Sequence, residues 1–395
     1  MRTKSKSFIM PTYGERDLAF ARGKGCYLYT TSGKKYLDFA GGIAVNSLGH
    51  CHPQLVKVLN KQSKILWHTS NLYNIKPQGD LAKLICENSF GESVFFCNSG
   101  AESLEGTIKL CRKYHFNNGD ENKKDILVCS NAFHGRTLGT LAAGDNEKHR
   151  EGFGVNTNGF IRVPFGDINE IKKFINKNTA AILVEPIQGE GGINRSPKGF
   201  IKNLRKLCTE NKILLALDEV QTGIGRTGKL FAHQWADIIP DVMAIAKGLG
   251  GGFPIGAVVA TKEAAAGMSA GTHGSTFGGN FLASSVAKSV ISQVIENGFL
   301  DNVIKMGNKL MKEIEDLSHN YPSIIKGVRG KGLMIGIICN MSNVELCTNL
   351  RDQGLLSVPA GNNVLRFLPP LNIEYEHVET CIEILKQTLD HMMAE

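Results

Sequence analysis

The chain has 395 residues and a net charge of +8, from 45 basic and 37 acidic residues. This length can bury a large core and predicts two domains, and the scattered charges show no basic stripe interleaved with aromatics, which argues against nucleic-acid binding. No apolar stretch approaches the roughly 18 residues that would span a bilayer, and near the start only residues 8–10 are apolar, too few for a signal-peptide core. Ten cysteines without metal-ligand spacing predict reduced thiols, no metal site and a soluble cytoplasmic protein.

The first part of the chain, residues 1–48, carries short alternating segments with glycine turns, for example 25–30 and 35–39. Further along, short apolar runs alternate with longer amphipathic ones. The apolar runs predict strands at residues 93–97, 125–129, 180–184, 213–217, 241–246 and 255–261. Amphipathic patterns such as 102–114 and 197–211 predict helices between them. This alternation favours an α/β fold with a mostly parallel sheet covered on both faces.

The last part of the chain returns to a mixed pattern. A helical pattern runs from about Ser284 toward Tyr321, then come strand-like segments at 332–339 and 364–367 and a final helix from about Glu376. We therefore expect a large domain at residues 49–283. The N-terminal segment 1–48 and the C-terminal segment 284–395 are expected to form a smaller α+β domain around it.

In a parallel sheet, ligands bind beyond the carboxyl ends of the strands. Ser99, Gly100, Ala101 and Glu102 follow the strand at 93–97. Their Ser-x-x-Glu spacing predicts a capping box at a helix start, where free backbone N–H groups can hold a phosphate. A plain helix cap is the alternative interpretation.

Two further strands end in candidate groups. After the strand at 125–129, Phe133 could cover a flat ring, Arg136 offers a fork for a carboxylate, and His134 is either a base or a packing residue. After the strand at 180–184, Glu185 and Glu190 accompany three glycines, a pattern that also makes simple turns. Two carboxylates might indicate glycoside hydrolysis, but that hypothesis gives no role to the acid and lysine described next.

Asp218 and Lys247 end two successive apolar strands, about thirty residues apart. A lysine held at the floor of a pocket can lose its proton. An amine beside a carboxylate is what pyridoxal phosphate (PLP) chemistry requires, because the lysine binds the cofactor and the acid keeps its pyridine nitrogen protonated. The glycines at 248–252 follow the lysine, which is the wrong order for a P-loop.

With these residues in place, the chain resembles the class III PLP-dependent aminotransferases over nearly its whole length. The resemblance is carried by the Lys247 turn and by motifs at residues 36–53, 98–102, 133–137, 185–190, 218–223, 274–280 and 366–371. It implies PLP fold type I, with a large domain built on a mostly parallel, seven-stranded type of sheet and a smaller α+β domain from both termini.

The resemblance also implies roles in cofactor binding. Lys247 holds PLP and moves the proton during the reaction, while Asp218 pairs with the pyridine nitrogen. Gln221 is implied to reach the ring hydroxyl, and Phe133 and Val220 to cover the two ring faces. The phosphate is implied to be held by Ser99, Gly100 and Ala101. Thr276 is implied to reach the phosphate of a neighbouring subunit, so that a homodimer would share its active sites.

Substrate binding is implied for a second set of residues: Arg136, Glu190, Arg366, Ser275 and Tyr13. In this interpretation Arg136 holds the distant α-carboxylate of the amino donor. Arg366 serves the carboxylate beside the reacting carbon of 2-oxoglutarate, and Glu190 masks Arg366 while the donor is bound. This masking is a hypothesis.

Within the class, the resemblance is to enzymes that act on N-acetylornithine. It implies transfer of the distal amine to 2-oxoglutarate, giving N-acetylglutamate 5-semialdehyde and glutamate in arginine biosynthesis. Succinyl-diaminopimelate, succinylornithine, free ornithine and 4-aminobutyrate are alternative donors, and an aminomutase is a further alternative. A non-enzymatic protein that binds a phosphoanion on the same sheet is the alternative from another functional class.

Overall fold

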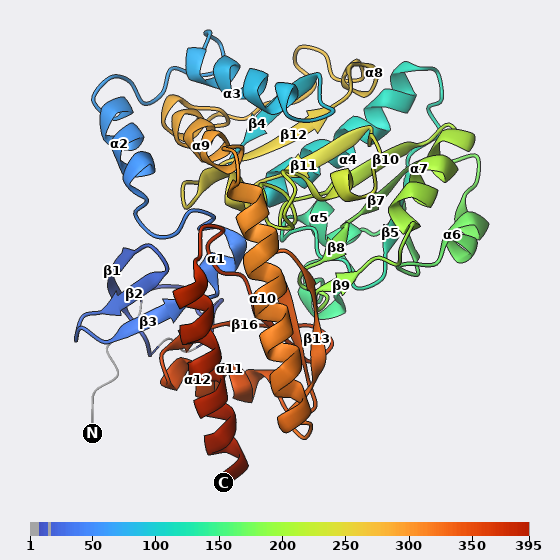
Figure 1. The fold of residues 1–395 in the computed structure, drawn as a ribbon. Helices are drawn as coiled ribbons and strands as arrows, with labels where there is room; N and C mark the ends of the chain where they lie inside the picture. Colours follow the sequence, from blue (N-terminus) through green and yellow to red (C-terminus); the bar gives the residue numbers. More distant parts are fainter. Residues whose placement is uncertain (1–7, 15–16, 395) are drawn as a thin grey trace.

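The computed structural model in Figure 1 describes residues 8–14 and 17–394. Its largest sheet has seven strands in the order β4-β12-β11-β10-β7-β5-β6. Their bounds are Ser93–Cys97 (β4), Gly256–Ala260 (β12), Val242–Ile245 (β11), Leu214–Asp218 (β10), Thr179–Val184 (β7), Asp125–Cys129 (β5) and Phe160–Val163 (β6). β12 runs antiparallel to both of its neighbours, and the other neighbouring pairs are parallel. The predicted mostly parallel α/β sheet is confirmed.

The central strands are mostly apolar because helices cover both faces of the sheet. On β10, Leu214 and Ala216 pack with residues of α4 (Gly100–Asn117), whereas Leu215 and Leu217 pack with residues of α7 (Phe200–Glu210). α6 (Ile168–Phe174) contributes to the same face as α7. Neighbouring residues of a strand point to opposite faces, so a strand between two helical layers needs apolar side chains at every position.

Two smaller sheets contain segments from the two ends of the chain. β1 (Phe20–Lys24), β2 (Tyr27–Thr30) and β3 (Lys35–Asp38) form an antiparallel sheet, which β15 (Leu355–Leu356) joins in parallel to β3. The other sheet has the order β13-β14-β17-β16 and is antiparallel. Its strands are Ile325–Lys331 (β13), Met334–Cys339 (β14), Val364–Phe367 (β17) and Val358–Ala360 (β16). The ends of the chain therefore fold together, as predicted.

The remaining helices connect and cover these sheets. The pattern predicted from Ser284 to Tyr321 is two helices, because Gly298 adopts a φ of 82° and begins a new one. The helices are α1 (Gly41–Ala44), α2 (Pro53–Gln62), α3 (Lys76–Glu87), α5 (Leu138–Ala143), α8 (Lys262–Ala265), α9 (Phe281–Val294), α10 (Phe299–Asn320), α11 (Asn343–Asp352) and α12 (Tyr375–Ala394). Short elements are β8 (Ile187–Gln188), β9 (Asn194–Arg195), η1 (Glu147–His149), η2 (Ala232–Trp235) and η3 (Lys247–Gly250).

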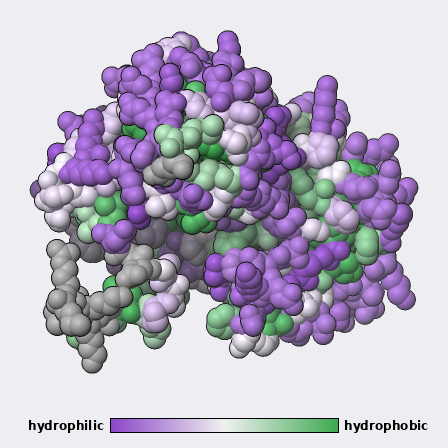
Figure 2. All heavy atoms as spheres, turned by 90° about the horizontal axis from the view of Figure 1, so that it is seen from below, coloured by the Kyte–Doolittle hydropathy of each residue, from purple (hydrophilic) through white to green (hydrophobic). Residues whose placement is uncertain are grey.

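The domain boundaries at 48/49 and 283/284 stay a prediction. Residues 1–7, 15–16 and 395 of the predicted small domain lie outside the described residues. Within the described ranges, no helix is both long and apolar enough to cross a membrane. Figure 2 shows the face that is turned downward in Figure 1. This face is mainly hydrophilic, with hydrophobic side chains in separate small patches.

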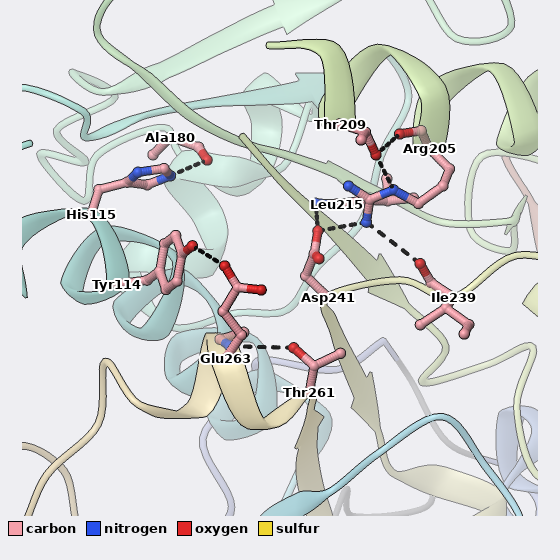
Figure 3. A network of polar contacts seen from close by, with 11 residues as sticks. Tyr114, His115, Ala180, Arg205, Thr209, Leu215, Ile239, Asp241, Thr261 and Glu263 are labelled. Carbon is pink, nitrogen blue, oxygen red and sulfur yellow. Dashed lines mark hydrogen bonds and ion pairs between the residues drawn. The ribbon is translucent and has the colours of Figure 1, made fainter. Parts of the chain in front are cut away.

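The amino-terminal edge of the large sheet is held by structural polar contacts (Figure 3). Asp241, just before β11, accepts hydrogen bonds from Arg205 Nη1 and from the backbone N–H of Leu215, both at 2.6 Å. On the other face, the hydroxyl of Tyr114 donates to Glu263 at 2.7 Å. These contacts fasten α7 to β10 and β11, and α4 to α8. Arg205 and Asp241 thus pair with each other at this edge, whereas charged groups at the opposite edge line a pocket.

Candidate active site

A pocket of about 160 Å³ lies at the carboxyl-terminal edge of the large sheet. Its lining comes from the loops after β4, β5, β7, β10 and β11, and consists of Gly100, Ala101, Phe133, His134, Gly135, Glu185, Glu190, Asp218, Val220, Gln221 and Lys247. The structure thus brings together the predicted groups from five separate strand ends.

Lys247 stands at the first position after the buried run that contains β11. Its backbone φ is +44°, in the left-handed region that a lysine rarely adopts and that is typical of functional positions. Burial lowers the pKa of its amine, and the nearby guanidinium of Arg366 lowers it further, against the opposing effect of Glu190. The amine is therefore more easily neutral, and hence nucleophilic, than an ordinary lysine.

Asp218 ends β10 and is oriented by two hydrogen bonds. Its Oδ1 accepts from the backbone N–H of Val220 at 3.0 Å, and its Oδ2 lies 2.7 Å from Nδ1 of His134. Because a carboxylate only accepts, Nδ1 carries the proton. Burial alone would lower the pKa of His134, but the hydrogen bond and charge of Asp218 outweigh it and raise this pKa. Of the two roles considered for His134, the geometry favours packing: it positions Asp218.

Glu185 tethers two neighbouring loops. Its Oε1 accepts from the backbone N–H of Phe133 at 3.0 Å and its Oε2 from that of Gly189 at 3.1 Å. Burial, followed by the charge of Asp218, raises the pKa of Glu185 to about 7. The charge of Asp218 therefore disfavours ionisation of the buried Glu185.

The start of α4 forms one wall of the pocket. Ser99 is the N-cap, and its Oγ accepts from the N–H of Glu102 at 3.2 Å. The other half of the predicted capping box is wrong: the carboxylate of Glu102 accepts from the backbone N–H and the side-chain amide of Asn98, at 2.6 and 2.9 Å. A Cβ on Gly100 would lie 2.7 Å from Val220 Cγ1, so glycine permits the close approach here.

The predicted pair of Glu190 and Arg366 is present and closed. Arg366, on β17, donates from Nη1 and Nη2 to the two carboxylate oxygens of Glu190, at 2.7 and 2.9 Å. Nη1 also lies 3.4 Å from Oε1 of Gln221. Burial would raise the pKa of Glu190, but Arg366 reverses this and lowers it. The pair joins the small sheet to the pocket, and its opening and closing stay a prediction.

Besides Ser99 and Arg366, which are described above, four predicted residues lie outside the lining of this pocket in their own chain. Arg136 is exposed at the rim, 3.1 Å from Nε2 of His149. The other three are Ser275, Thr276 and Tyr13. Ser275 Oγ lies 3.2 Å from the amide of Asn98 and accepts from the N–H of Gly278. Thr276 borders a separate hollow beside Asn98, and Tyr13 is 73% exposed.

The sequence interpretation missed the support beneath Lys247. In the short turn Gly41–Ala44 all four residues have positive φ values, of 53 to 63°. Asp38 Oδ1 accepts from two backbone N–H groups at the start of this turn, and its Oδ2 lies 2.7 Å from Nε2 of His50. Ser47, just after the turn, donates to the carbonyl of Gly248 at 2.9 Å. The adjacent pair of glycines in this motif was the available signal.

The donor set of the pocket fits PLP. It provides a buried amine on Lys247, an oriented carboxylate on Asp218, the start of the 18-residue helix α4 for a phosphate, and the side chains of Phe133 and Val220 for a flat ring. Because Gly100 has no side chain, Val220 can lie directly against the start of α4, and any side chain at this position would displace Val220.

Comparisons with known proteins agree with this geometry. The family model of class-III aminotransferases matches residues 10–389. An acetylornithine aminotransferase of Bradyrhizobium diazoefficiens is 50% identical over 98% of this chain and 96% of its own. The ornithine aminotransferase of Toxoplasma gondii is similar in structure, with a TM-score of 0.94, 29% identity, and coverage of 98% and 93% of the two chains. The N-acetylornithine aminotransferase of Stenotrophomonas maltophilia gives a TM-score of 0.85 with 35% identity, over 96% and 97%. The chain thus belongs to the class-III aminotransferase family and is a PLP-dependent transaminase.

Proposed function

We propose that this enzyme transfers the distal amine of N-acetyl-L-ornithine to 2-oxoglutarate, giving N-acetyl-L-glutamate 5-semialdehyde and L-glutamate, a step of arginine biosynthesis. The observation that carries the proposal is the closed pair of Glu190 and Arg366 beside Lys247. The donor has no carboxylate on its reacting carbon, whereas 2-oxoglutarate has one. A guanidinium that can be covered or uncovered suits a pocket that must accept both. Relatives named for acetylornithine support this choice of donor.

When bound, PLP supplies an electron-withdrawing ring beside the reacting carbon. The protein contributes positioning and proton transfer. With the cofactor bound, Nζ of Lys247 would be placed to take the proton from the amine-bearing carbon of the donor and to hold it for return. Asp218, held by His134, would place its negative charge at the pyridine nitrogen, and Gln221 would reach the ring hydroxyl. The backbone at the start of α4 would hold the phosphate.

Substrate selection then depends on two arginines. Arg136 at the rim holds the carboxylate that lies far from the reacting carbon. Arg366 holds the near carboxylate of 2-oxoglutarate after Glu190 has swung away. Ser275 and Tyr13 stay predicted substrate contacts.

We also propose that the enzyme is a homodimer with shared active sites. Apolar side chains are exposed around the loop that carries Thr276: Trp67, Leu72, Tyr73 and Phe277 are 59–86% exposed. Asn71 joins the two segments, because its side-chain amide donates to the carbonyls of Ser275 and Gly278, both at 3.0 Å. An apolar surface of this kind marks a protein interface. A second copy packed there would receive Thr276 in its pocket.

We also propose a cytoplasmic location, because the ten cysteines are unpaired.

Single-turnover spectra test the choice of donor. The PLP-loaded enzyme is mixed separately with N-acetylornithine, succinyl-diaminopimelate, ornithine and 4-aminobutyrate, and loss of the visible cofactor band is followed. N-acetylornithine is expected to react fastest. Faster reaction of a free amine would keep the transaminase and overturn the donor. Lys247→Ala serves as the control and is expected to abolish turnover.

A further inference from the structure

A second cleft, of about 460 Å³, lies at the base of the β8–β9 hairpin, between the start of α7, η2 and the end of β13. The turn of this hairpin carries Glu190 into the active-site pocket, while Ile187 and Arg195 at its base line the second cleft. β9 and β13 lie side by side at this point (Figure 1). The cleft is therefore separate from the active site, although one hairpin borders both.

The charged side chains that line this cleft are all cationic. They are Arg195 on β9, Lys198 and Lys202 around the start of α7, and Lys331 at the end of β13. No acidic residue is among its described lining, and none of these four takes part in an ion pair within the described ranges. Instead, Nζ of Lys331 rests 3.6 Å from the ring centroid of Trp235. Burial, followed by the charge of Arg195, lowers the pKa of Lys331.

The start of α7 adds to this positive field. Gly199 is its N-cap, with a φ of 83° and no side chain to cap the helix. The N–H of Phe200 donates to the carbonyl of Pro197 at 3.0 Å, but Gly199 offers no side-chain oxygen to the next N–H groups of this 11-residue helix. Helix N-termini attract anions, and here the terminus lies among lysines that line the same cleft.

We propose that this cleft binds a small multivalent oxyanion, such as a phosphate ester or a polycarboxylate. Cations from three separate segments converge on it without a protein anion to neutralise them. Groups spaced in this way suit a ligand that offers several charged oxygens at once, because each contact is a charge-assisted hydrogen bond. A bound oxyanion would relieve the repulsion between Arg195 and Lys331 and would draw Lys331 away from Trp235.

Calorimetric titration of the PLP-loaded enzyme at constant ionic strength tests the proposal, with pyrophosphate and citrate as the two probes. Saturable binding of one anion per chain is expected, and the stronger probe identifies the ligand type. Lys331→Gln should weaken binding by about tenfold or more, which corresponds to one charge-assisted contact. Lys326→Gln is the matched control, because Lys326 is an exposed lysine of the same strand, and it should bind as the wild type does.

Several outcomes would overturn the proposal. These are the absence of saturable binding by either probe, equal weakening in the Lys331 and Lys326 variants, and binding that neither Lys331→Gln nor Arg195→Gln changes. The last result would place the anion at another basic site, such as the arginines of the active site. The visible cofactor band of each variant reports that it is folded and loaded. The test needs no turnover, so its failure would leave the proposed reaction untouched.

Discussion

Among single residues, Glu190 offers the sharpest test of how one pocket takes two substrates. Glu190→Gln keeps the shape of the side chain but removes the charge that neutralises Arg366. We expect the half-reaction with N-acetylornithine to slow by about tenfold or more, because an unpaired buried guanidinium would face the uncharged end of the donor. The half-reaction with 2-oxoglutarate should keep its rate or become faster. Stopped-flow spectra of both half-reactions measure this.

The matched control is Glu151→Gln, because Glu151 is an exposed glutamate outside the pocket. It should leave both half-reactions as they are in the wild type. If Glu190→Gln also changes neither half-reaction, the ion pair does not act as a switch between substrates.

Glu185 gives a prediction about pH. Its pKa in the folded protein is about 7, above the ordinary 4.5. A raised pKa means that this group favours folding below about pH 4.5 and that the advantage is lost as the pH rises to about 7. Glu185→Gln stays neutral at every pH. The melting temperature of the cofactor-free variant, minus that of the cofactor-free wild type, should therefore be higher at pH 8 than at pH 5. The corresponding change in the difference between the two free energies of unfolding is about 1–3 kcal/mol. An equal difference at both pH values would contradict the raised pKa.

Contacts between residues that are far apart in the sequence set the limit of what the sequence can predict about single residues. Strand ends bring groups to one edge of a sheet, so Lys247, Asp218 and Glu185 could be placed together from the apolar pattern alone. The contact between His134 and Asp218 spans 84 residues and the pair of Glu190 and Arg366 spans 176. No local pattern encodes such contacts: the resemblance alone indicated the ion pair, and the first contact was not predicted.

Among elements, the strongly apolar strands were easier to predict than the edge strand β6 and the strand directions. The run at 125–129 coincides with the central strand β5, which is apolar because helices cover both faces. The run at 93–97 coincides with β4, which is the other edge strand but is still mostly apolar. β6 lies at the edge of the sheet and is mostly half-buried, so its pattern was too weak to predict a strand. β12 was predicted as a strand, but an apolar run does not encode direction, and its antiparallel orientation emerged only from the structure.

The contact between β12 and α4 leads to a prediction at this scale. A Cβ on Gly256 would collide with the carbonyl oxygen of Ser99, which accepts the N–H of Ser103 in the first turn of α4. We expect Gly256→Ala to push the start of α4 out of place. It should lower the free energy of unfolding by about 1–3 kcal/mol and weaken PLP binding in a spectral titration.

Gly327→Ala is the control for this substitution, since nothing lies within 4 Å of a Cβ at that position. It should leave PLP affinity unchanged. Full retention of PLP affinity in Gly256→Ala would show that the start of α4 tolerates displacement and would count against its role as the phosphate site.

For the molecule as a whole, the pocket depends on both ends of the chain. Lys247 comes from the large sheet, whereas Arg366 comes from β17 of the C-terminal sheet. The pairing of β15 with β3 fastens the N-terminal sheet to the C-terminal part. Movement of the small sheets relative to the large one would therefore move Arg366 relative to Lys247, and would change the ion pair that Arg366 forms with Glu190.

The proposed dimer extends this dependence to a second chain, and mixing two inactive variants tests it. Lys247→Ala destroys the site of its own chain. Thr276→Arg should block the site of the partner, because Thr276 lies outside the pocket of its own chain. In a mixed dimer one site then combines an intact Lys247 with an intact Thr276. Unfolding and refolding the two variants together should restore about one quarter of wild-type activity, since about half of the dimers are mixed and each has one working site. If Thr276 served its own chain, the mixture would stay inactive.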